Sequence, residues 1–180
     1  MILYIHGFRT TVESHKAQIL KEYYHLDNIF IADHSLVPAQ AIKDLETIIE
    51  TQKITAIIAS SLGGYYATYL SEKYNLKTVL INPSVTPYKT LKKHLGENER
   101  QDGMKFILTQ EHLDMLESLK VENPTLKNYF LFLQKGDEVL DYSIAHNFYK
   151  GCKLVIEDGG NHRFKGFGRF FDEVSEFFGL

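Results

Sequence analysis

Two hydrophobic patterns alternate along most of this chain. Short runs of consecutive apolar residues predict strands, and stretches whose apolar residues recur every three or four positions predict amphipathic helices. We expect strands over residues 2–5, 28–32, 55–59, 78–81, 129–133 and 153–156. We expect helices over residues 11–24, from Pro38 onward, over residues 62–74 and from about residue 166 onward. The alternation predicts an α/β protein with a mostly parallel central sheet and helices on both faces.

Residues 84–128 interrupt this alternation. The first half of the segment is rich in charge, and the second half, residues 109–119, predicts an amphipathic helix that Thr109 would cap. The inward face of this helix holds Leu113, Leu116 and Leu119. Long connections in compact proteins usually have structure or a function of their own. We therefore expect a small helical excursion, either a cap over a site or a surface feature, within a single domain of residues 1–180.

The composition fits a protein with a sizeable core, because 44% of the 180 residues are hydrophobic. The net charge of −3 provides no bulk attraction to nucleic acid or to an anionic membrane, and we expect neither as a partner. No apolar run is long enough to cross a bilayer, and the first residues lack the features of a signal peptide. The single cysteine, Cys152, excludes an intramolecular disulfide, so we expect a cytoplasmic protein.

The candidate chemistry begins where the third expected strand meets its helix, in Ala59-Ser60-Ser61-Leu62-Gly63. This segment is similar to the nucleophile elbow, a tight strand-to-helix turn that exposes a serine hydroxyl at its apex. Small residues are needed two positions before and after the serine because the two backbones nearly touch there. The start of the helix supplies free N–H groups, which suit a developing oxyanion. We therefore predict that Ser61 is a nucleophile.

A serine nucleophile needs a base and an acid, and proteins with this elbow place the acid and then the histidine after the serine. His162 lies in a glycine-rich loop after the last expected strand, where it could take and return the serine proton. Asp137 follows the preceding strand and would fix the tautomer of the imidazole. Other acidic residues that could take this role are Glu138, Asp141 and Asp158. Asp137 is the first choice because it comes directly after Gly136.

The loop after the first strand, His6-Gly7-Phe8, predicts the second half of an oxyanion hole. Gly7 permits the backbone to turn, so that the N–H of Phe8 can pair with the N–H of Leu62. We interpret His6 as a residue that orients this loop by hydrogen bonding and not as a base. Phe8, Tyr65 and the apolar side of the helix expected over residues 109–119 are the expected walls of a substrate pocket for a small or medium acyl group.

Nothing in the sequence predicts a metal or a nucleotide cofactor, and we expect none. No pair of histidines shows helical metal-ligand spacing with a glutamate, and no His-x-His occurs. The chain also lacks a Gly-x-Gly-x-x-Gly turn at the start of a helix, and it lacks a P-loop.

Together these motifs resemble the YqiA/YcfP-type family of small bacterial esterases in the α/β-hydrolase superfamily. The similarity covers nearly the whole chain and is carried by residues 1–8, 60–67, 82–83, 136–142 and 160–164. It implies an α/β-hydrolase fold and a serine esterase with Ser61 as nucleophile, Asp137 as acid and His162 as base. Ala59, where many relatives have glycine, is the one departure, and a methyl group should be tolerated there.

Three functions remain open at this level. The leading one is hydrolysis of small to medium carboxylic esters through an acyl-serine intermediate, with a small-molecule ester as the expected partner. A thioesterase or an acyltransferase would use the same three side chains, because only the acceptor and the pocket differ. The third is a binding protein that keeps a hydrolase scaffold without turnover, since a fold does not imply a function.

Overall fold

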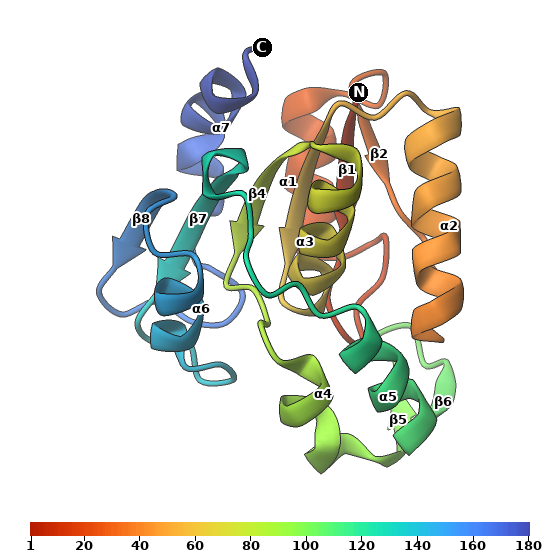
Figure 1. The fold of residues 1–180 in the computed structure, drawn as a ribbon. Helices are drawn as coiled ribbons and strands as arrows, with labels where there is room; N and C mark the ends of the chain where they lie inside the picture. The colour runs from red at the N-terminus through yellow and green to blue at the C-terminus, as the bar shows by residue number, and fades with distance from the viewer.

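The computed structural model describes residues 1–180 and contains the expected central sheet. Its six strands are all parallel and follow the order β2-β1-β3-β4-β7-β8 (Figure 1). They are β1 (Ile2–Ile5), β2 (Ile29–Ile31), β3 (Ala56–Ser60), β4 (Lys77–Ile81), β7 (Tyr129–Gln134) and β8 (Lys153–Glu157). The ends of each strand lie within a single residue of the ends expected from its apolar run, which confirms the predicted sheet.

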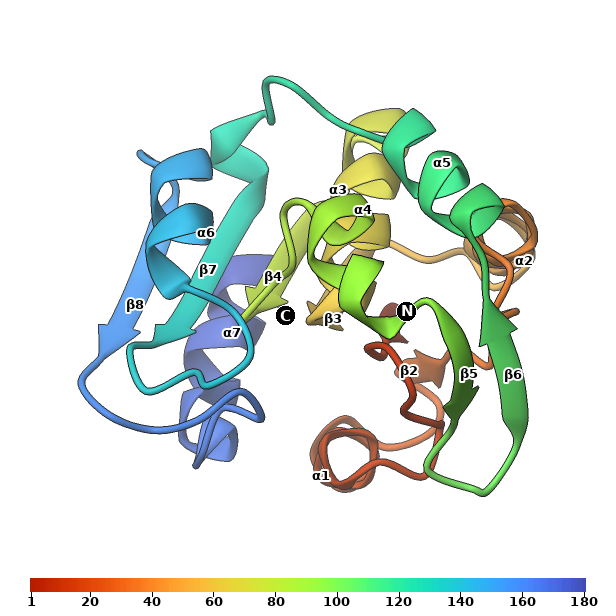
Figure 2. The same ribbon diagram turned by 90° about the horizontal axis from the view of Figure 1, so that it is seen from below.

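Helices cover both faces of the sheet (Figure 2). They are α1 (His15–Tyr24), α2 (Pro38–Thr51), α3 (Leu62–Tyr74), α6 (Tyr142–Phe148) and α7 (Phe171–Phe178). Successive side chains of a strand point to opposite faces, so each apolar run supplies two cores. Leu3 and Ile57 belong to the core under α2, α3 and α6, whereas Tyr4 and Ile58 belong to the core under α1 and α7.

The order of the strands reverses between β1 and β3. The chain first places β2 on the outer side of β1 and then returns to place β3 on the other side. Ligands of open parallel sheets bind in the crevice that such a reversal creates beyond the carboxyl ends of the strands. The loop His6-Gly7-Phe8 leaves β1 at this position, and Ser61 directly follows β3. The topology therefore brings the two expected halves of the site together.

Residues 84–128, called the excursion below, contain more structure than the sequence predicted. They form α4 (Pro87–Thr90), a 3₁₀ turn (Leu91–His94), an antiparallel hairpin of β5 (Gly96–Glu99) and β6 (Lys105–Leu108), and α5 (Gln110–Ser118). The expected helix is α5: Thr109 Oγ1 accepts a hydrogen bond from the N–H of His112, and Leu113 and Leu116 are buried. The hairpin is not among the expected elements because the residues of β5 are polar apart from one glycine. The excursion lies on the side of the sheet where the strands end (Figure 1).

Three helical features differ from the expected ones. Helix α1 begins later than its apolar pattern, because Ser14 Oγ accepts a hydrogen bond from the N–H of Ala17 and caps the helix. Helix α6 is an additional element, and Asp141 caps it by accepting a hydrogen bond from the N–H of Ser143. Near the carboxyl end, a 3₁₀ turn (Phe167–Phe170) precedes α7 where one continuous helix was expected.

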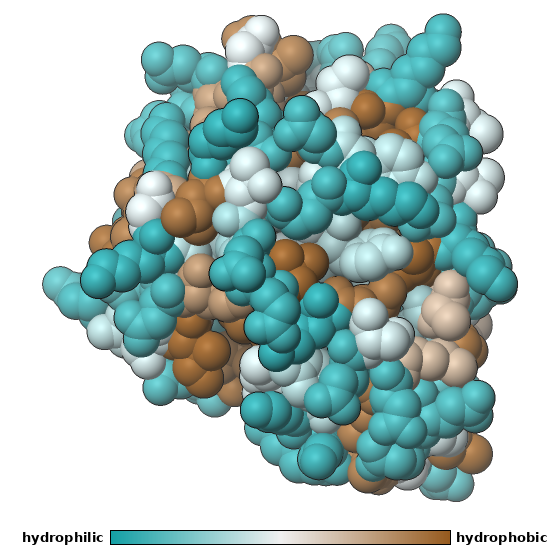
Figure 3. Space-filling view, in the orientation of Figure 1, coloured by the Kyte–Doolittle hydropathy of each residue, from teal (hydrophilic) through white to brown (hydrophobic).

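The face of the molecule in Figure 1 is mostly hydrophilic, and its apolar side chains form small, separate spots (Figure 3). None of the helices combines the length and the apolar character that crossing a membrane requires. The larger apolar side chains are mostly enclosed in the two cores.

Candidate active site

Ser61 occupies the turn between β3 and α3, with backbone angles φ 53° and ψ −125°. A positive φ is uncommon for a residue with a side chain, and it raises an elbow serine above the sheet. Two glycines make room for this turn. A Cβ on Gly63 would lie 2.3 Å from the carbonyl oxygen of Ile5. A Cβ on Gly7 would lie 2.9 Å from the Cβ of Ser61, so the loop after β1 packs directly on the serine.

His162 lies between the Ser61 hydroxyl and the carboxylate of Asp137. Its Nε2 atom is 3.0 Å from Ser61 Oγ, and its Nδ1 atom is 2.8 Å from Oδ2 of Asp137. The Asp137 side chain is 2% exposed, and its Oδ1 accepts hydrogen bonds from two backbone N–H groups, those of Val139 and Leu140. Because a carboxylate only accepts, the imidazole donates its Nδ1–H to Asp137 and presents the Nε2 lone pair to the serine.

The other acidic residues near the imidazole have different partners. Glu138 accepts a hydrogen bond from the backbone N–H of His162 at 3.0 Å, and this bond lowers the pKa of its carboxyl group. Asp141 caps α6, and Asp158 pairs with a lysine at 2.7 Å while its side chain is 91% exposed. Of the four candidates, the structure therefore places only Asp137 against the imidazole ring.

The expected oxyanion hole consists of the backbone N–H groups of Phe8 and Leu62. Phe8 follows Gly7, which packs on Ser61, and Leu62 directly follows the serine. Leu62 is also the first residue of α3, where an N–H has no intrahelical acceptor. Neither N–H takes part in the backbone hydrogen bonds of the turns, loops and caps. Two donors next to the hydroxyl are thus free to bind a substrate oxygen.

His6 holds the loop that carries Phe8. Its Nδ1 atom lies 3.1 Å from the carbonyl oxygen of Gly7, which also accepts the Thr10 hydroxyl at 2.8 Å. Burial, together with a smaller effect of the stacked ring of His34, lowers the pKa of His6 to about 4. The ring is therefore neutral at pH 7 and has the contacts of a loop-orienting group. No group of three or more histidine, cysteine, aspartate or glutamate side chains is arranged to hold a metal ion.

Two buried amide side chains position the loop that carries His162, and the sequence analysis did not identify either. Asn82, at the end of β4, donates through Nδ2 to the carbonyl oxygens of Asn161 and His162, both at 3.1 Å. Gln134, at the end of β7, accepts the N–H groups of Asn161 and Lys165 at 3.1 and 2.8 Å. Their signal in the sequence is a polar residue that directly follows an apolar strand.

Two cavities meet at Ser61 and His162. The first, called the excursion cavity, has a volume of about 510 Å³ and extends toward the excursion, with Leu91 and Leu140 among its apolar walls. The second, called the α1 cavity, has a volume of about 570 Å³ and extends toward the first turn of α1 and the loop after His162. Phe8 borders both cavities, which is the place expected for a wall of the substrate pocket.

The apolar side of α5 borders neither of these cavities, and neither does Tyr65, so the expected place of both in the substrate pocket is corrected. The side chain of Tyr65 is 5% exposed, and its hydroxyl donates to the carbonyl oxygen of Leu116 in α5 at 2.8 Å. Tyr65 lies one helical turn beyond Ser61, where its ring belongs to the core that α3 shares with the excursion. Its role in the structure is to connect these two parts.

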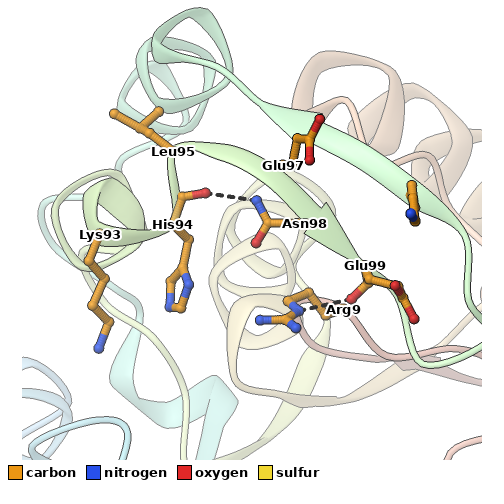
Figure 4. A pocket seen from close by; sticks show the side chains of 8 residues that line it. Arg9, Lys93, His94, Leu95, Glu97, Asn98 and Glu99 are labelled. Atoms are coloured by element: carbon orange, nitrogen blue, oxygen red, sulfur yellow. Dashed lines mark hydrogen bonds between the residues drawn. The ribbon is translucent and has the colours of Figure 1, made fainter.

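The excursion is attached to the loop that carries Phe8. Arg9 Nε donates to the carbonyl oxygen of Glu99 at 2.9 Å, and the N–H of Gln101 donates to the carbonyl oxygen of Arg9 at 2.9 Å. A hollow of about 410 Å³ lies between Arg9 and the hairpin (Figure 4). His94 borders both this hollow and the excursion cavity. The excursion therefore forms part of the wall around Ser61.

A parallel sheet that reverses its order at a serine elbow defines the α/β-hydrolase class of fold. Within this class, the chain belongs to the family described as "Uncharacterised protein family (UPF0227)", whose model matches residues 1–179. A UPF0227 protein of Serratia proteamaculans is 23% identical over 98% of each chain. A UPF0227 protein of Shewanella woodyi is 32% identical over 84% of this chain and 86% of its own. The protein YcfP of Salmonella paratyphi A is 20% identical over 98% of both, and the resemblance to the YcfP type is confirmed.

Solved structures of low sequence identity share the fold. Est1E from Butyrivibrio proteoclasticus, with ferulic acid bound, is 19% identical, has a TM-score of 0.75, and covers 99% of this chain and 87% of its own. Mouse alpha/beta hydrolase domain-containing protein 10 is 16% identical, has a TM-score of 0.75, and covers 97% of this chain and 89% of its own. These similarities confirm the α/β-hydrolase fold.

Proposed function

We propose that the protein is a serine hydrolase that cleaves small to medium carboxylic esters through an acyl-serine intermediate. The observation that carries the proposal is the continuous hydrogen-bonded row from Ser61 Oγ through His162 to Asp137, next to two cavities. This row matches the nucleophile, base and orienting acid of acyl-transfer enzymes. Support also comes from a structural neighbour whose name describes an esterase domain, that of a Rhodothermus marinus protein with a TM-score of 0.70.

The proposed reaction begins when Ser61 Oγ attacks the ester carbonyl carbon and transfers its proton to Nε2 of His162. The oxyanion of the tetrahedral intermediate accepts hydrogen bonds from the N–H groups of Phe8 and Leu62. The intermediate collapses, the bond from carbon to the alcohol oxygen breaks, and His162 returns the proton to that oxygen. Water, deprotonated by His162, then attacks the acyl carbon. The bond from this carbon to Ser61 Oγ breaks, His162 returns the proton to Oγ, and the carboxylic acid is released. Asp137 orients the imidazole and stabilises its protonated form in both halves.

The excursion is proposed as a cap that completes the substrate pocket. Its residue Leu91 and the loop residues Val139 and Leu140 add apolar surface to the excursion cavity, beside Phe8. A cavity of about 510 Å³ falls within the range of ordinary small-molecule sites. The size and the apolar walls support a small or medium acyl group as the part of the substrate that enters here.

Covalent labelling by a fluorophosphonate tests the proposed nucleophile. We expect stoichiometric labelling of the wild-type protein at Ser61, and loss of labelling and of ester hydrolysis in Ser61→Ala. Ser60→Ala is the matched control, because the Ser60 hydroxyl lies 3.1 Å from the Tyr4 hydroxyl and bonds within the protein. Labelling that persists in Ser61→Ala and disappears in Ser60→Ala would contradict the assignment, and a folded wild-type protein without labelling would favour a non-catalytic binding protein.

A panel of esters and thioesters with acyl chains of increasing length tests the substrate class. We expect higher values of kcat/KM for short and medium esters than for long ones. Each added methylene is preferred only if it finds burial worth roughly 0.8 kcal/mol, and the excursion cavity is limited in volume. A steady rise of kcat/KM into long chains, or a consistent preference for thioesters of equal length, would contradict the proposed substrate class.

A further inference from the structure

The α1 cavity beside Ser61 is lined by cations and by no acidic residue. Lys16, Arg163 and Lys165 border it, and neither aspartate nor glutamate does. None of these three side chains lies within ion-pair distance of a carboxylate anywhere in the protein. The side chains that border the cavity therefore place unbalanced positive charge next to the nucleophile.

Lys16 is the best enclosed of the three cations. Its Nζ donates to the backbone carbonyl oxygen of Arg163 at 2.5 Å, which leaves the positive charge without an ionic partner. Burial, and to a lesser extent the charge of Arg163, lowers the pKa of Lys16 to about 8. The side chain is half-buried, so its ammonium loses part of its hydration without gaining a compensating charge. An anion bound in the cavity would supply the missing charge.

The first turn of α1 forms another part of the cavity wall through Ser14, His15 and Lys16. This turn contains no acidic residue, so the partial positive charge at the start of the ten-residue helix is not neutralised within it. The N–H groups of His15 and Lys16 donate to no backbone acceptor outside the helix. The helix dipole therefore acts in the same direction as the three side-chain cations.

Positive charge of this kind is not general in the molecule. The net charge of the chain is −3. The hollow in Figure 4 is bordered by cations as well, but Glu97 and Glu99 are also part of its wall. On the other side of Ser61, the excursion cavity is bordered by Arg9, Lys93 and Arg163, but also by the carboxylate of Glu138 and by apolar walls. Of these three cavities, only the α1 cavity has cations in its wall and no carboxylate.

We propose that the substrate carries an anionic group, a carboxylate or a phosphate, which binds in the α1 cavity between Lys16, Arg163 and Lys165 while the ester carbon lies at Ser61. The apolar part of the same substrate occupies the excursion cavity. This inference rests on the proposed ester hydrolysis and narrows its substrate class to esters of anionic small molecules. The cations act by binding and orientation, and no bond to them forms or breaks.

The test compares kcat/KM for anionic esters with that for neutral esters of the same length. The monoethyl ester of glutarate against ethyl hexanoate examines a carboxylate on the acid part. The butyrate ester of 3-hydroxypropanoate against butyl butyrate examines a carboxylate on the alcohol part. The butyrate ester of 3-hydroxypropyl phosphate against hexyl butyrate examines a phosphate there. We expect at least one anionic ester to exceed its neutral partner by tenfold or more, since a hydrogen bond to a charged group contributes about that factor.

Variants that remove a positive charge from the α1 cavity test whether the cavity causes the preference for anionic esters. We expect the ratio of anionic to neutral kcat/KM to fall roughly tenfold in Lys16→Gln and again in Arg163→Gln. Lys21→Gln is the matched control on the same helix, because Lys21 lies outside the cavity. If Lys16→Gln does not fold, Arg163→Gln and Lys165→Gln, both of exposed side chains, supply the same measurement.

The outcomes separate this inference from the proposed function. A wild-type ratio near one for all three pairs, or a ratio that the cavity variants leave unchanged, overturns the anionic substrate while Ser61-dependent cleavage of neutral esters still supports a hydrolase. A protein that cleaves none of the esters and is not labelled at Ser61 overturns the proposed function itself. The anionic ester with the larger ratio identifies carboxylate or phosphate as the group that binds.

Discussion

Ser61 has the backbone geometry that a nucleophile elbow requires, and this geometry is unfavourable by itself. A residue with a side chain at φ 53° and ψ −125° costs on the order of 1–3 kcal/mol. The surroundings maintain it: Gly63 allows α3 to approach the carbonyl oxygen of Ile5, and Gly7 allows the loop after β1 to approach Ser61. The small residues of the motif are therefore needed for packing at the turn as much as for chemistry.

The carboxylate that faces His162 should matter for turnover far more than its acidic neighbours. We expect Asp137→Asn to lower kcat by roughly a thousandfold or more, because an amide can donate to Nδ1 and so favour the wrong tautomer. Asp158→Asn is the control, since Asp158 is exposed and pairs with Lys135. Steady-state kinetics on a short ester measures both. Comparable losses in the two variants would move the acid away from Asp137.

The buried ring of His6 should make folding sensitive to acid. Its pKa lies near 4 in the folded protein and near 6.5 when unfolded, so between these values the unfolded chain binds a proton that the folded protein does not. The contribution of His6 to the free energy of unfolding is therefore at its full value above pH 6.5. It decreases as the pH falls toward 4, by about 3 kcal/mol at most. Urea unfolding at several pH values should show a shallower decrease for His6→Gln. Identical slopes for both proteins would exclude this role.

Among the elements, α3 joins the nucleophile to the excursion. Its first residues form the elbow, and one turn later Tyr65 bonds to the carbonyl oxygen of Leu116 in α5. The hairpin of the excursion bonds in turn to Arg9, in the loop that carries Phe8. The excursion is thus connected to both sides of the candidate site through side chains that do not themselves touch the proposed reaction centre.

The variant Tyr65→Phe should weaken the contact between α3 and the excursion without weakening substrate binding. We expect the free energy of unfolding to fall by about 1 kcal/mol, because the carbonyl of Leu116 loses the hydroxyl of Tyr65 and keeps only the N–H of Leu119 as a donor. KM for short esters should stay within about twofold, since Tyr65 borders neither cavity at Ser61.

Tyr74→Phe is the control for Tyr65→Phe on the same helix, because the Tyr74 hydroxyl bonds to an exposed glutamate. Its effect on stability, measured by urea denaturation, should be within about 0.5 kcal/mol. A large rise in KM for Tyr65→Phe would return Tyr65 to the substrate pocket.

At the scale of the whole molecule, the charge at the α1 cavity has the opposite sign to the net charge of the chain. The chain carries a net charge of −3, while Lys16, Arg163 and Lys165 concentrate positive charge at the α1 cavity. If an anionic substrate binds there, kcat/KM for that substrate should fall by about threefold to tenfold between 0.05 and 0.5 M NaCl, because salt screens exposed charges. The neutral ester of the same length is the control. Equal salt dependence for the two esters would contradict an electrostatic role for the cavity.

The features that the sequence predicted correctly depend on local patterns. Apolar runs located every strand of the central sheet. A strand that helices cover on both faces is buried on both sides, so nearly all of its residues are apolar. The elbow was recognisable because the close contact of two backbones requires small residues on both sides of the serine, at positions 59 and 63. The polar strand β5 was missed for the opposite reason: its pairing with β6 has no apolar signature.

Other features exist only in the folded chain, where residues distant in sequence share one surface. Four carboxylates could have faced His162, and the hydrogen bonds around each one assigned the position to Asp137. Lys16 and Arg163 are 147 positions apart, and they meet because α1 and the loop after β8 cover the same end of the sheet. The local pattern of the sequence determined the fold and the nucleophile turn. The tertiary structure decided which charges surround that turn, because electrostatic interaction depends on distance in space and not on separation along the chain.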